Sequence, residues 1–221
     1  LSALSGSRTG TYAYDQVGNI IHDGANDLDL TYNPLNLLEK VEDKEGILAK
    51  YTYLGDGTKL SAFDAVGNGL FYAGSLVYRK QGETSSLESA AFAGGRLTVT
   101  SNTIEPYYHL TDHLGSVRCI IDAKGQVLER NDYYPFGLRW ENVQQLVSDA
   151  NVPYADYGAR MYDGRIGRWM AQDPLCQFYS PYLFSANNAV RFVDPNGLWT
   201  SVDGGFSTNN PFEIADFLSA A

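Results

Sequence analysis

The stretch that decides the fold lies between residues 157 and 198. It contains Tyr157–Asp163 (YGARMYD), Gly167–Pro174 (GRWMAQDP) and Asn187–Leu198 (NNAVRFVDPNGL), with Asp-Pro dipeptides at Asp173 and Asp194. Aromatic residues, glycines and Asp-Pro pairs at this density are typical of tight turns between short strands. We therefore expect this part of the chain to consist of short β-strands joined by turns.

Upstream of this stretch, the first sixty residues repeat a short motif. The motif recurs around Tyr14, Tyr32 and Tyr53. In each copy an aromatic residue or leucine stands two positions before the tyrosine, and a polar turn and an aliphatic strand follow it. A repeat of about 20 residues with one turn per unit indicates two short strands per repeat. Because a single unit cannot bury its own apolar face, neighbouring units must stack.

Composition excludes some partners. The chain has 221 residues, of which 44% are apolar, so a buried core is feasible. Its net charge of −10 argues against binding to nucleic acid or to an anionic membrane surface. No apolar run reaches the ~18 residues of a membrane span. The chain begins at Leu1 without a leader, so we interpret it as an internal or C-terminal piece of a longer protein.

Two short helices are predicted in an otherwise β sequence. Apolar residues recur with helical spacing over residues 141–150. Near the C-terminus, Asn210 and Pro211 suit the start of a second helix over residues 211–219.

His109 and His113 have a spacing that would bind zinc on a helix, where the two rings share a face. The neighbouring Tyr107 and Gly115 favour a strand and a turn instead. Four strand residues span about 13 Å, which is too far for one ion. We therefore expect no metal site and no cofactor.

The two cysteines, Cys119 and Cys176, form no CxxC pair. They are either two thiols or one disulfide, and the sequence leaves both alternatives open.

Asp173 and Asp194 are the candidate catalytic pair, each at a turn and each followed by proline. Two carboxylates brought within about 3 Å of each other cannot both ionise, so one keeps its proton. Such a dyad can activate water with one oxygen and protonate a leaving amine with the other. The alternative is that each carboxylate only caps the amides of its own turn.

Three arginines near this pair also have two interpretations. Arg160, Arg165 and Arg168 can each form an ordinary ion pair at a strand end. One that lies beside the dyad would instead hold a carboxylate ionised or polarise the scissile carbonyl.

Residues 107–198 resemble the RHS repeat-associated core of RHS/YD-repeat proteins, in the form common in Bacteroidetes-like sequences. Besides the three segments quoted first, the matching words are Asp112–Arg118 (DHLGSVR), Tyr133–Gly137 (YYPFG) and Ser180–Tyr182 (SPY). The upstream tyrosine motifs resemble the YD repeat, which is named for the Tyr-Asp seen at Tyr14-Asp15.

The resemblance implies a mainly β fold, in which YD repeats form an antiparallel β-sheet shell and the core domain closes one end. It divides the chain into YD-like repeats and strands over residues 1–105, the core domain over 106–198 and a variable tail over 199–221.

The resemblance also implies an activity. In many members the core is an aspartic autoprotease that cuts after the leucine of its Asp-Pro-x-Gly-Leu word. Asp173 and Asp194 would be the dyad, Arg160 its supporting cation, and Leu198–Trp199 the bond cut. The C-terminal passenger would be released from the shell of a bacterial protein that is secreted or held at the cell surface. The implied partners are this passenger, an immunity protein and a secretion apparatus.

Two features depart from the family pattern. Residues 140–151 are predicted as a helix where relatives carry a strand, and only 23 residues follow Leu198. A segment of that length is too short for an independently folded toxin. The alternative function is therefore a non-catalytic structural or adhesive surface module that binds carbohydrate on its tyrosine-rich strands.

Overall fold

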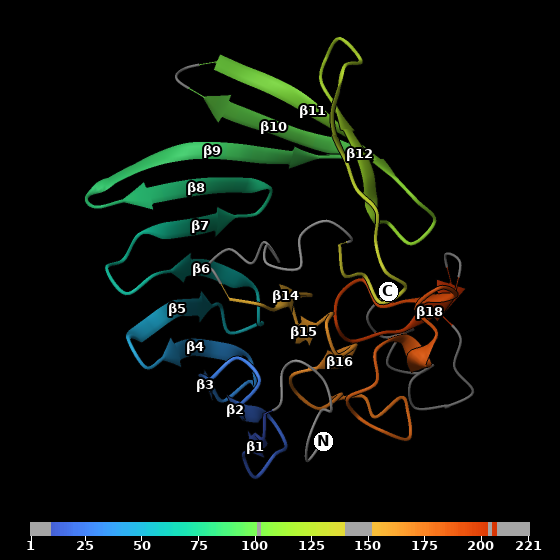
Figure 1. The fold of residues 1–221 in the computed structure, drawn as a ribbon. Coiled ribbons are helices and arrows are strands. Elements are labelled where there is room, and N and C mark those ends of the chain that lie inside the picture. Colours follow the sequence, from blue (N-terminus) through green and yellow to red (C-terminus); the bar gives the residue numbers. More distant parts are fainter. Residues whose placement is uncertain (1–9, 101–102, 140–151, 203–204, 207–221) are drawn as a thin grey trace.

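The protein is described by a computed structural model that covers residues 10–100, 103–139, 152–202 and 205–206 (Figure 1). The helices predicted at 141–150 and 211–219 lie outside the described residues. The described chain is mainly β, which confirms the predicted fold class.

One antiparallel sheet of thirteen strands extends from Tyr12 to Arg130, and its strands follow one another in sequence order. Its strands are β1 (Tyr12–Tyr14), β2 (Ile20–Asp23), β3 (Leu28–Tyr32), β4 (Leu38–Asp43), β5 (Gly46–Tyr53), β6 (Lys59–Phe63), β7 (Gly69–Ala73), β8 (Leu76–Gln81), β9 (Thr84–Phe92), β10 (Gly95–Thr100), β11 (Thr103–Thr111), β12 (Val117–Ile121) and β13 (Val127–Arg130). The hairpins β1–β2, β3–β4 and β5–β6 confirm the prediction of two strands per repeat.

Several of the connecting turns share one hydrogen-bond pattern. The carboxylate of Asp15 accepts from the amides of Val17 and Asn19, and the amide of Gly18 donates to the Asp15 carbonyl. The same contacts recur in the turns that begin at Asn33, Asp64, Asp112 and Asp122. The fourth residue of each turn has positive φ, which glycine and asparagine tolerate best. Local turn chemistry therefore sets where each hairpin reverses.

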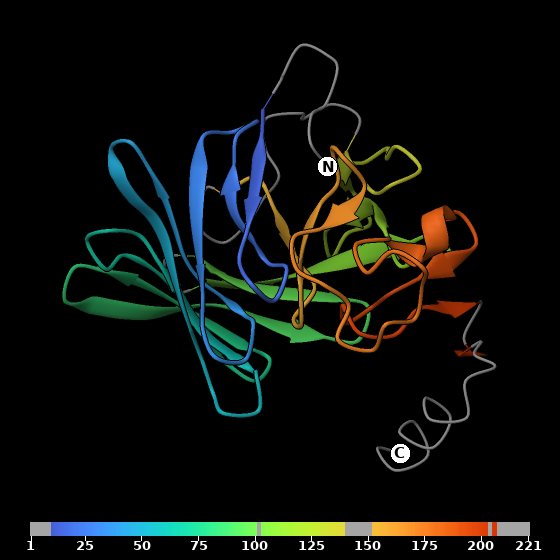
Figure 2. The same cartoon turned by 90° about the horizontal axis from the view of Figure 1, so that it is seen from below.

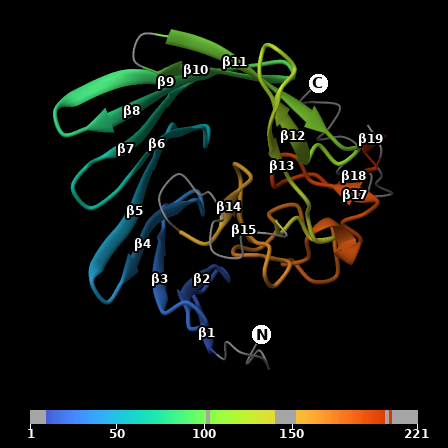
Figure 3. The same cartoon turned by 45° about the horizontal axis from the view of Figure 1, so that its top comes forward.

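The sheet curves, and residues 152–202 lie on its concave side (Figures 1, 2 and 3). We call residues 152–202 the inner segment. It contains the small sheet β14 (Ala155–Asp156), β15 (Met161–Asp163) and β16 (Arg168–Trp169), then the 3-10 turn η1 (Ser185–Asn187), then β17 (Phe192–Val193) and β18 (Ser201–Val202). β19 (Gly205–Phe206) pairs with β18.

The main apolar core lies between the first half of the sheet and the inner segment. Inward-facing residues alternate with exposed ones along β3, where Leu28 and Leu30 are buried and Asp29 is exposed. The cluster comprises Ile20, Leu28, Leu30, Leu38, Val41, Ala49, Tyr51 and Ala62 from the sheet and Val152, Tyr154, Met161 and Met170 from the inner segment. Burial of each large apolar side chain stabilises the fold by about 1.5–3 kcal/mol. Burial is thus the main force that holds the inner segment in the sheet.

The repeat tyrosines also contact the inner segment. The hydroxyl of Tyr32 donates to the carbonyl of Met170, and the rings of Tyr14 and Tyr182 lie 5.9 Å apart. Tyr14 and Tyr32 therefore belong to the large sheet and also contact the inner segment.

A buried polar network around Asp23 joins β2 to the inner segment. Asp23 is fully buried, and its Oδ2 accepts a 2.6 Å hydrogen bond from the hydroxyl of Tyr154. Arg165 forms a bidentate ion pair with Asp163 and donates to Asn26 on the sheet side. Because buried charge is costly unless paired, these contacts specify how the two parts dock.

Replacing Tyr154 by phenylalanine is expected to lower the free energy of unfolding by about 1.5–3 kcal/mol, the usual contribution of a hydrogen bond to a charged group. Chemical denaturation measures the change. Tyr108→Phe, on the exposed face of β11, is the matched control and should stay within about 0.5 kcal/mol of the wild type. Equal stability of the two variants would contradict the assigned role of Tyr154.

The division expected between residues 105 and 106 stays a prediction. β11 runs across it, and β11 to β13 continue the large sheet. The reason is that the DHLGSVR word forms another turn of the repeat type, so strand pairing continues through it. Within the described part of the chain, no helix has the length and apolar composition of a membrane span.

Candidate active site

Arg160 is positioned by a tight turn that leads into β15. Gly158 has φ of 90°, and the amide of Tyr157 donates to the carbonyl of Arg160. All three residues of β15 are buried, so the strand that follows Arg160 is firmly packed. The Arg160 side chain is only 4% exposed. A buried guanidinium requires anionic or carbonyl partners, and the structure supplies both kinds.

Asp173 is held by its own turn. Its carboxylate accepts from the amides of Leu175 at 3.0 Å and Gln177 at 3.1 Å, and its backbone amide donates to the carbonyl of Pro181. The alternative in which this carboxylate caps a turn is therefore correct as a description of local contacts. The same carboxylate also lies 3.7 Å from Nη1 of Arg160, so capping is only part of its environment.

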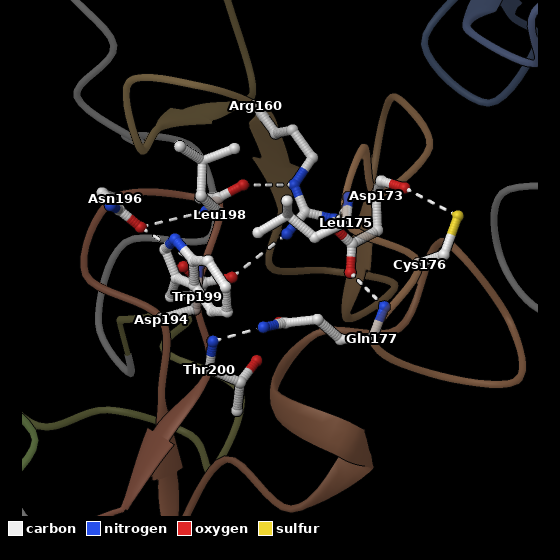
Figure 4. A network of polar contacts seen from close by, with 11 residues as sticks. Arg160, Asp173, Leu175, Cys176, Gln177, Asp194, Asn196, Leu198, Trp199 and Thr200 are labelled. Atoms are coloured by element: carbon white, nitrogen blue, oxygen red, sulfur yellow. Dashed lines mark hydrogen bonds and ion pairs between the residues drawn. The ribbon is translucent and has the colours of Figure 1, made fainter. Parts of the chain in front are cut away.

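Asp194 reaches Arg160 from a different turn. Its Oδ2 lies 3.1 Å from Nη2 of Arg160, and the residue is 2% exposed. Figure 4 shows Arg160 between the two aspartates. The structure thus brings together Arg160, Asp173 and Asp194, the three residues selected from the sequence, with the guanidinium bridging the carboxylates.

An aromatic cluster supports this triad. The guanidinium of Arg160 lies over the ring of Trp169, 4.1 Å from its centroid, which is a favourable cation–π distance. Trp169 packs with Tyr157, Tyr162 and Phe184 in a second buried cluster. These rings exclude water around the triad and strengthen the electrostatic interactions within it.

Burial raises the pKa of Asp194 above its ordinary value. Arg160 opposes the rise, whereas the negative charge of Asp173 adds to it. Burial also raises the pKa of Tyr157 to about 12, with a further contribution from Asp194, so the phenol is neutral at physiological pH. Asp194 therefore keeps its proton to a higher pH than an ordinary aspartate does.

The other two arginines have structural partners. Arg165 is paired with Asp163 in the network around Asp23, and Arg168 donates to the side chain of Asn187. Among the described residues, Nη1 of Arg160 and Oδ1 of Asp194 are buried atoms that lack a hydrogen-bond partner. The charged groups around Arg165 have no such unsatisfied atoms within the described chain. Unsatisfied charged atoms together with the raised pKa of Asp194 make the Arg160 triad a candidate site for chemistry.

The bond expected to be cut lies next to the triad. Nε of Arg160 donates a 2.5 Å hydrogen bond to the carbonyl of Gly197, the residue before Leu198. Gly197 has φ of 73°, and a Cβ at this position would lie 3.0 Å from the amide nitrogen of Arg160. Only glycine allows this close approach, so the Asp-Pro-Asn-Gly turn brings the backbone before Leu198–Trp199 up to Arg160.

Two polar residues in this region were missed by the sequence analysis. Asn196 accepts from the amides of Leu198 and Trp199, and Gln177 accepts from the amide of Thr200. The Asp-Pro-Asn-Gly turn could have indicated Asn196, because asparagine commonly bonds to amides two residues ahead. No local signal identifies Gln177.

Cys176 belongs to the Asp173 turn, where its Sγ donates to the carbonyl of Asp173 at 3.6 Å, whereas His109 and His113 lie elsewhere. His109 lies on β11, and His113 lies in the next turn, with Nε2 3.3 Å from the carbonyl of Val190. No group of three metal-ligating side chains occurs among the described residues. Cys119 and Cys176 are both free thiols, which answers the question that the sequence left open.

Relatives of known sequence include a bacterial nuclease, a bacterial toxin subunit and an insect surface protein. The chain is 28% identical to the tRNA3(Ser)-specific nuclease WapA of Bacillus spizizenii over 88% of its length and 27% identical to the toxin subunit YenC1 of Yersinia entomophaga over 69%. It is 35% identical to salivary gland surface protein 1 of Aedes aegypti over 41%. The matches cover 9%, 17% and 3% of those proteins, so the chain spans a small part of each.

Solved structures share the fold. The TcdB2-TccC3 crystal structure superposes with a TM-score of 0.67 and 22% identity over 84% of this chain and 11% of that one. A Tc holotoxin pore of Photorhabdus luminescens gives 0.67 and 20% identity over 89% of this chain and 11% of that one. At these identities the likeness establishes the architecture.

Most of the sequence matches the model of a known family. Residues 8–189 match the Teneurin YD-shell, which is most of the chain and includes both the repeats and the turn with Asp173. This match agrees with the resemblance to YD-repeat proteins and with the curved sheet around an inner segment. The chain therefore belongs to the Teneurin YD-shell family.

Proposed function

We propose that this chain is part of the shell of a toxin-type RHS/YD-repeat protein and cuts its own backbone between Leu198 and Trp199. The observation that carries the proposal is the buried triad of Arg160, Asp173 and Asp194 beside the Gly197 carbonyl. These groups come from three separate turns. Because burying charged groups is unfavourable, a buried cluster of this kind favours a functional role over a purely structural one.

The two carboxylates differ in ways that suit different roles. The carboxylate of Asp173 accepts two backbone amide hydrogen bonds and lies 3.7 Å from Nη1 of Arg160. Asp194 has a raised pKa because it is buried. One proton on Asp194 would also leave the buried triad neutral, since one arginine then faces one carboxylate. We assign Asp173 as the general base and Asp194 as the general acid.

The proposed step is a hydrolysis. Asp173 takes a proton from a water molecule as its oxygen attacks the carbonyl carbon of Leu198, and Asp194 hydrogen-bonds to the carbonyl oxygen. When the tetrahedral intermediate collapses, Asp173 gives the proton that it took from the water to the nitrogen of Trp199 as the C–N bond breaks, which leaves a Leu198 carboxyl group and a free amine. Because the bond belongs to the same chain, enforced proximity accelerates this single turnover.

The wider role proposed is release of whatever follows residue 198. The inner segment already lies within the curved sheet, and relatives named as nucleases and a toxin subunit share this region. An immunity protein and a secretion apparatus remain proposed partners, and secretion or surface display the proposed location. Surface carbohydrate belongs to the alternative function as a binding module.

Intact mass spectrometry of the purified chain tests the proposal. The expected product ends at Leu198 and is accompanied by the peptide of residues 199–221. A folded chain that keeps all 221 residues across the acidic to neutral pH range would contradict self-cleavage and support the non-catalytic module.

Cleavage should depend on pH in a direction set by Asp194. Its pKa in the fold lies above the ordinary 3.8, so the acid form persists to higher pH than usual. The rate constant should fall as pH rises through that raised pKa. At pH values between the ordinary pKa of 3.8 and the raised pKa, the folded chain binds a proton at Asp194 that the unfolded chain does not. The contribution of Asp194 to the free energy of unfolding is therefore fully present below pH 3.8 and is lost as pH rises through the raised pKa. A time course at several pH values measures the rate, and a rate that increases with pH across this window would contradict the assignment.

A further inference from the structure

The chain around the Leu198–Trp199 bond is held at consecutive backbone groups. Arg160 holds the Gly197 carbonyl, and the side chain of Asn196 accepts from the amides of Leu198 at 3.0 Å and Trp199 at 3.2 Å. Beyond the bond, Oε1 of Gln177 accepts from the amide of Thr200 at 3.2 Å. Ser201 then pairs with Val193 as β18 meets β17. The segment is therefore fixed on both sides of the bond.

Gln177 differs from the other contacts because it joins this segment to an aspartate. Its backbone amide donates to Oδ2 of Asp173 at 3.1 Å, while its side chain receives the amide of Thr200. Figure 4 shows the Gln177 side chain extending from the Asp173 turn toward Thr200. One residue thus sets the separation between the proposed base and the backbone just past the scissile bond.

We propose that Gln177 is a positioning residue that holds the cleavable segment in register with Asp173, an inference that rests on the proposed self-cleavage. Gln177 touches neither the attacking water nor the carbonyl of Leu198, so it acts through Thr200 and Asp173. Thr200 is 8% exposed, which leaves its amide little access to water as a substitute partner. Reacting groups must lie within about 3–3.5 Å, and a misplacement of about 1 Å can cost 10²-fold in rate.

The test compares two substitutions at Gln177. Leucine has a similar size but no acceptor for the Thr200 amide, so Gln177→Leu should slow the appearance of the product ending at Leu198 by about 10- to 100-fold. Glutamate keeps an acceptor, so Gln177→Glu should cleave at low pH within a few-fold of the wild type. Its added carboxylate near Asp173 should move the descending limb of the pH profile upward. If the role of Gln177 were purely structural, Gln177→Glu would neither restore cleavage at low pH nor displace the pH profile.

Gln126→Leu is the matched control, because it makes the same chemical change at an exposed turn position. It should leave the rate unchanged, and thermal melts should show that all variants are folded. Wild-type rates in Gln177→Leu, or equal slowing by leucine and glutamate in folded protein, would overturn the inference while self-cleavage stands. A wild-type chain that is never cut would instead overturn the proposed function itself.

Discussion

Replacing Asp173 or Asp194 by asparagine is expected to slow cleavage after Leu198 by about 10²–10⁴-fold, the usual contribution of a positioned acid or base. Asparagine has nearly the same shape as aspartate, but it neither takes a proton from water nor carries one to a carbonyl. Each carboxylate contacts Arg160 from its own turn, and neither can replace the other. Each single variant should therefore lose most of the cleavage after Leu198.

The measurement is the fraction of chain ending at Leu198, followed by intact mass spectrometry over time. Asp64→Asn is the matched control, because Asp64 caps a repeat turn through its carboxylate and lies on the large sheet. It tests the simple capping alternative directly. If Asp173→Asn cleaved as fast as Asp64→Asn, Asp173 would be a turn cap and nothing more.

Replacing Arg160 by methionine should lower the free energy of unfolding by about 3–5 kcal/mol, the cost of removing one partner from a buried ion pair. Two buried carboxylates would then face each other without a cation, and the Gly197 carbonyl would lose its donor. The loss should shrink as pH falls, because protonation removes the uncompensated charge.

Chemical denaturation at several pH values measures this effect, with Arg191→Met as the control. Arg191 is exposed and lies over Phe192, so its loss should change stability by no more than about 0.5 kcal/mol. Combining Arg160→Met with Asp173→Asn and Asp194→Asn should recover much of the loss, since no charge is then left buried. A combined variant as unstable as Arg160→Met would show that packing on Trp169, rather than charge, dominates.

Much of the fold could be predicted because its signals are local. The tyrosines at 14, 32 and 53 marked hairpins correctly, since each hairpin depends on alternation and on turn residues within about ten positions. The turns that begin at Asp64, Asp112 and Asp122 are local in the same way, since aspartate and glycine recur in them with the same spacing. The domain division near residue 105 came from the family resemblance, because strand pairing continues through it and leaves no local signal.

The candidate site was predictable only in part. The Asp-Pro words pointed to Asp173 and Asp194, and the family resemblance singled out Arg160. Composition and spacing could not separate Arg160 from Arg165. Arg160 precedes the short strand β15, Arg165 follows it, and both side chains lie beside carboxylates. Gln177 could not be identified from the sequence, because its partner Thr200 is distant in the chain and only folding brings the two together.

The amino-acid sequence by itself determined the β-hairpins, their turns and the positions of the acidic bends, because these depend on neighbouring residues along the chain. Only the tertiary structure decided that Arg160 would bridge Asp173 and Asp194 while Arg165 joins Asp163 and Asn26. The physical reason is that charge pairing depends on which turns are brought together when the inner segment packs into the curved sheet. That packing is driven by apolar burial over the whole core, and no short stretch of sequence records its outcome.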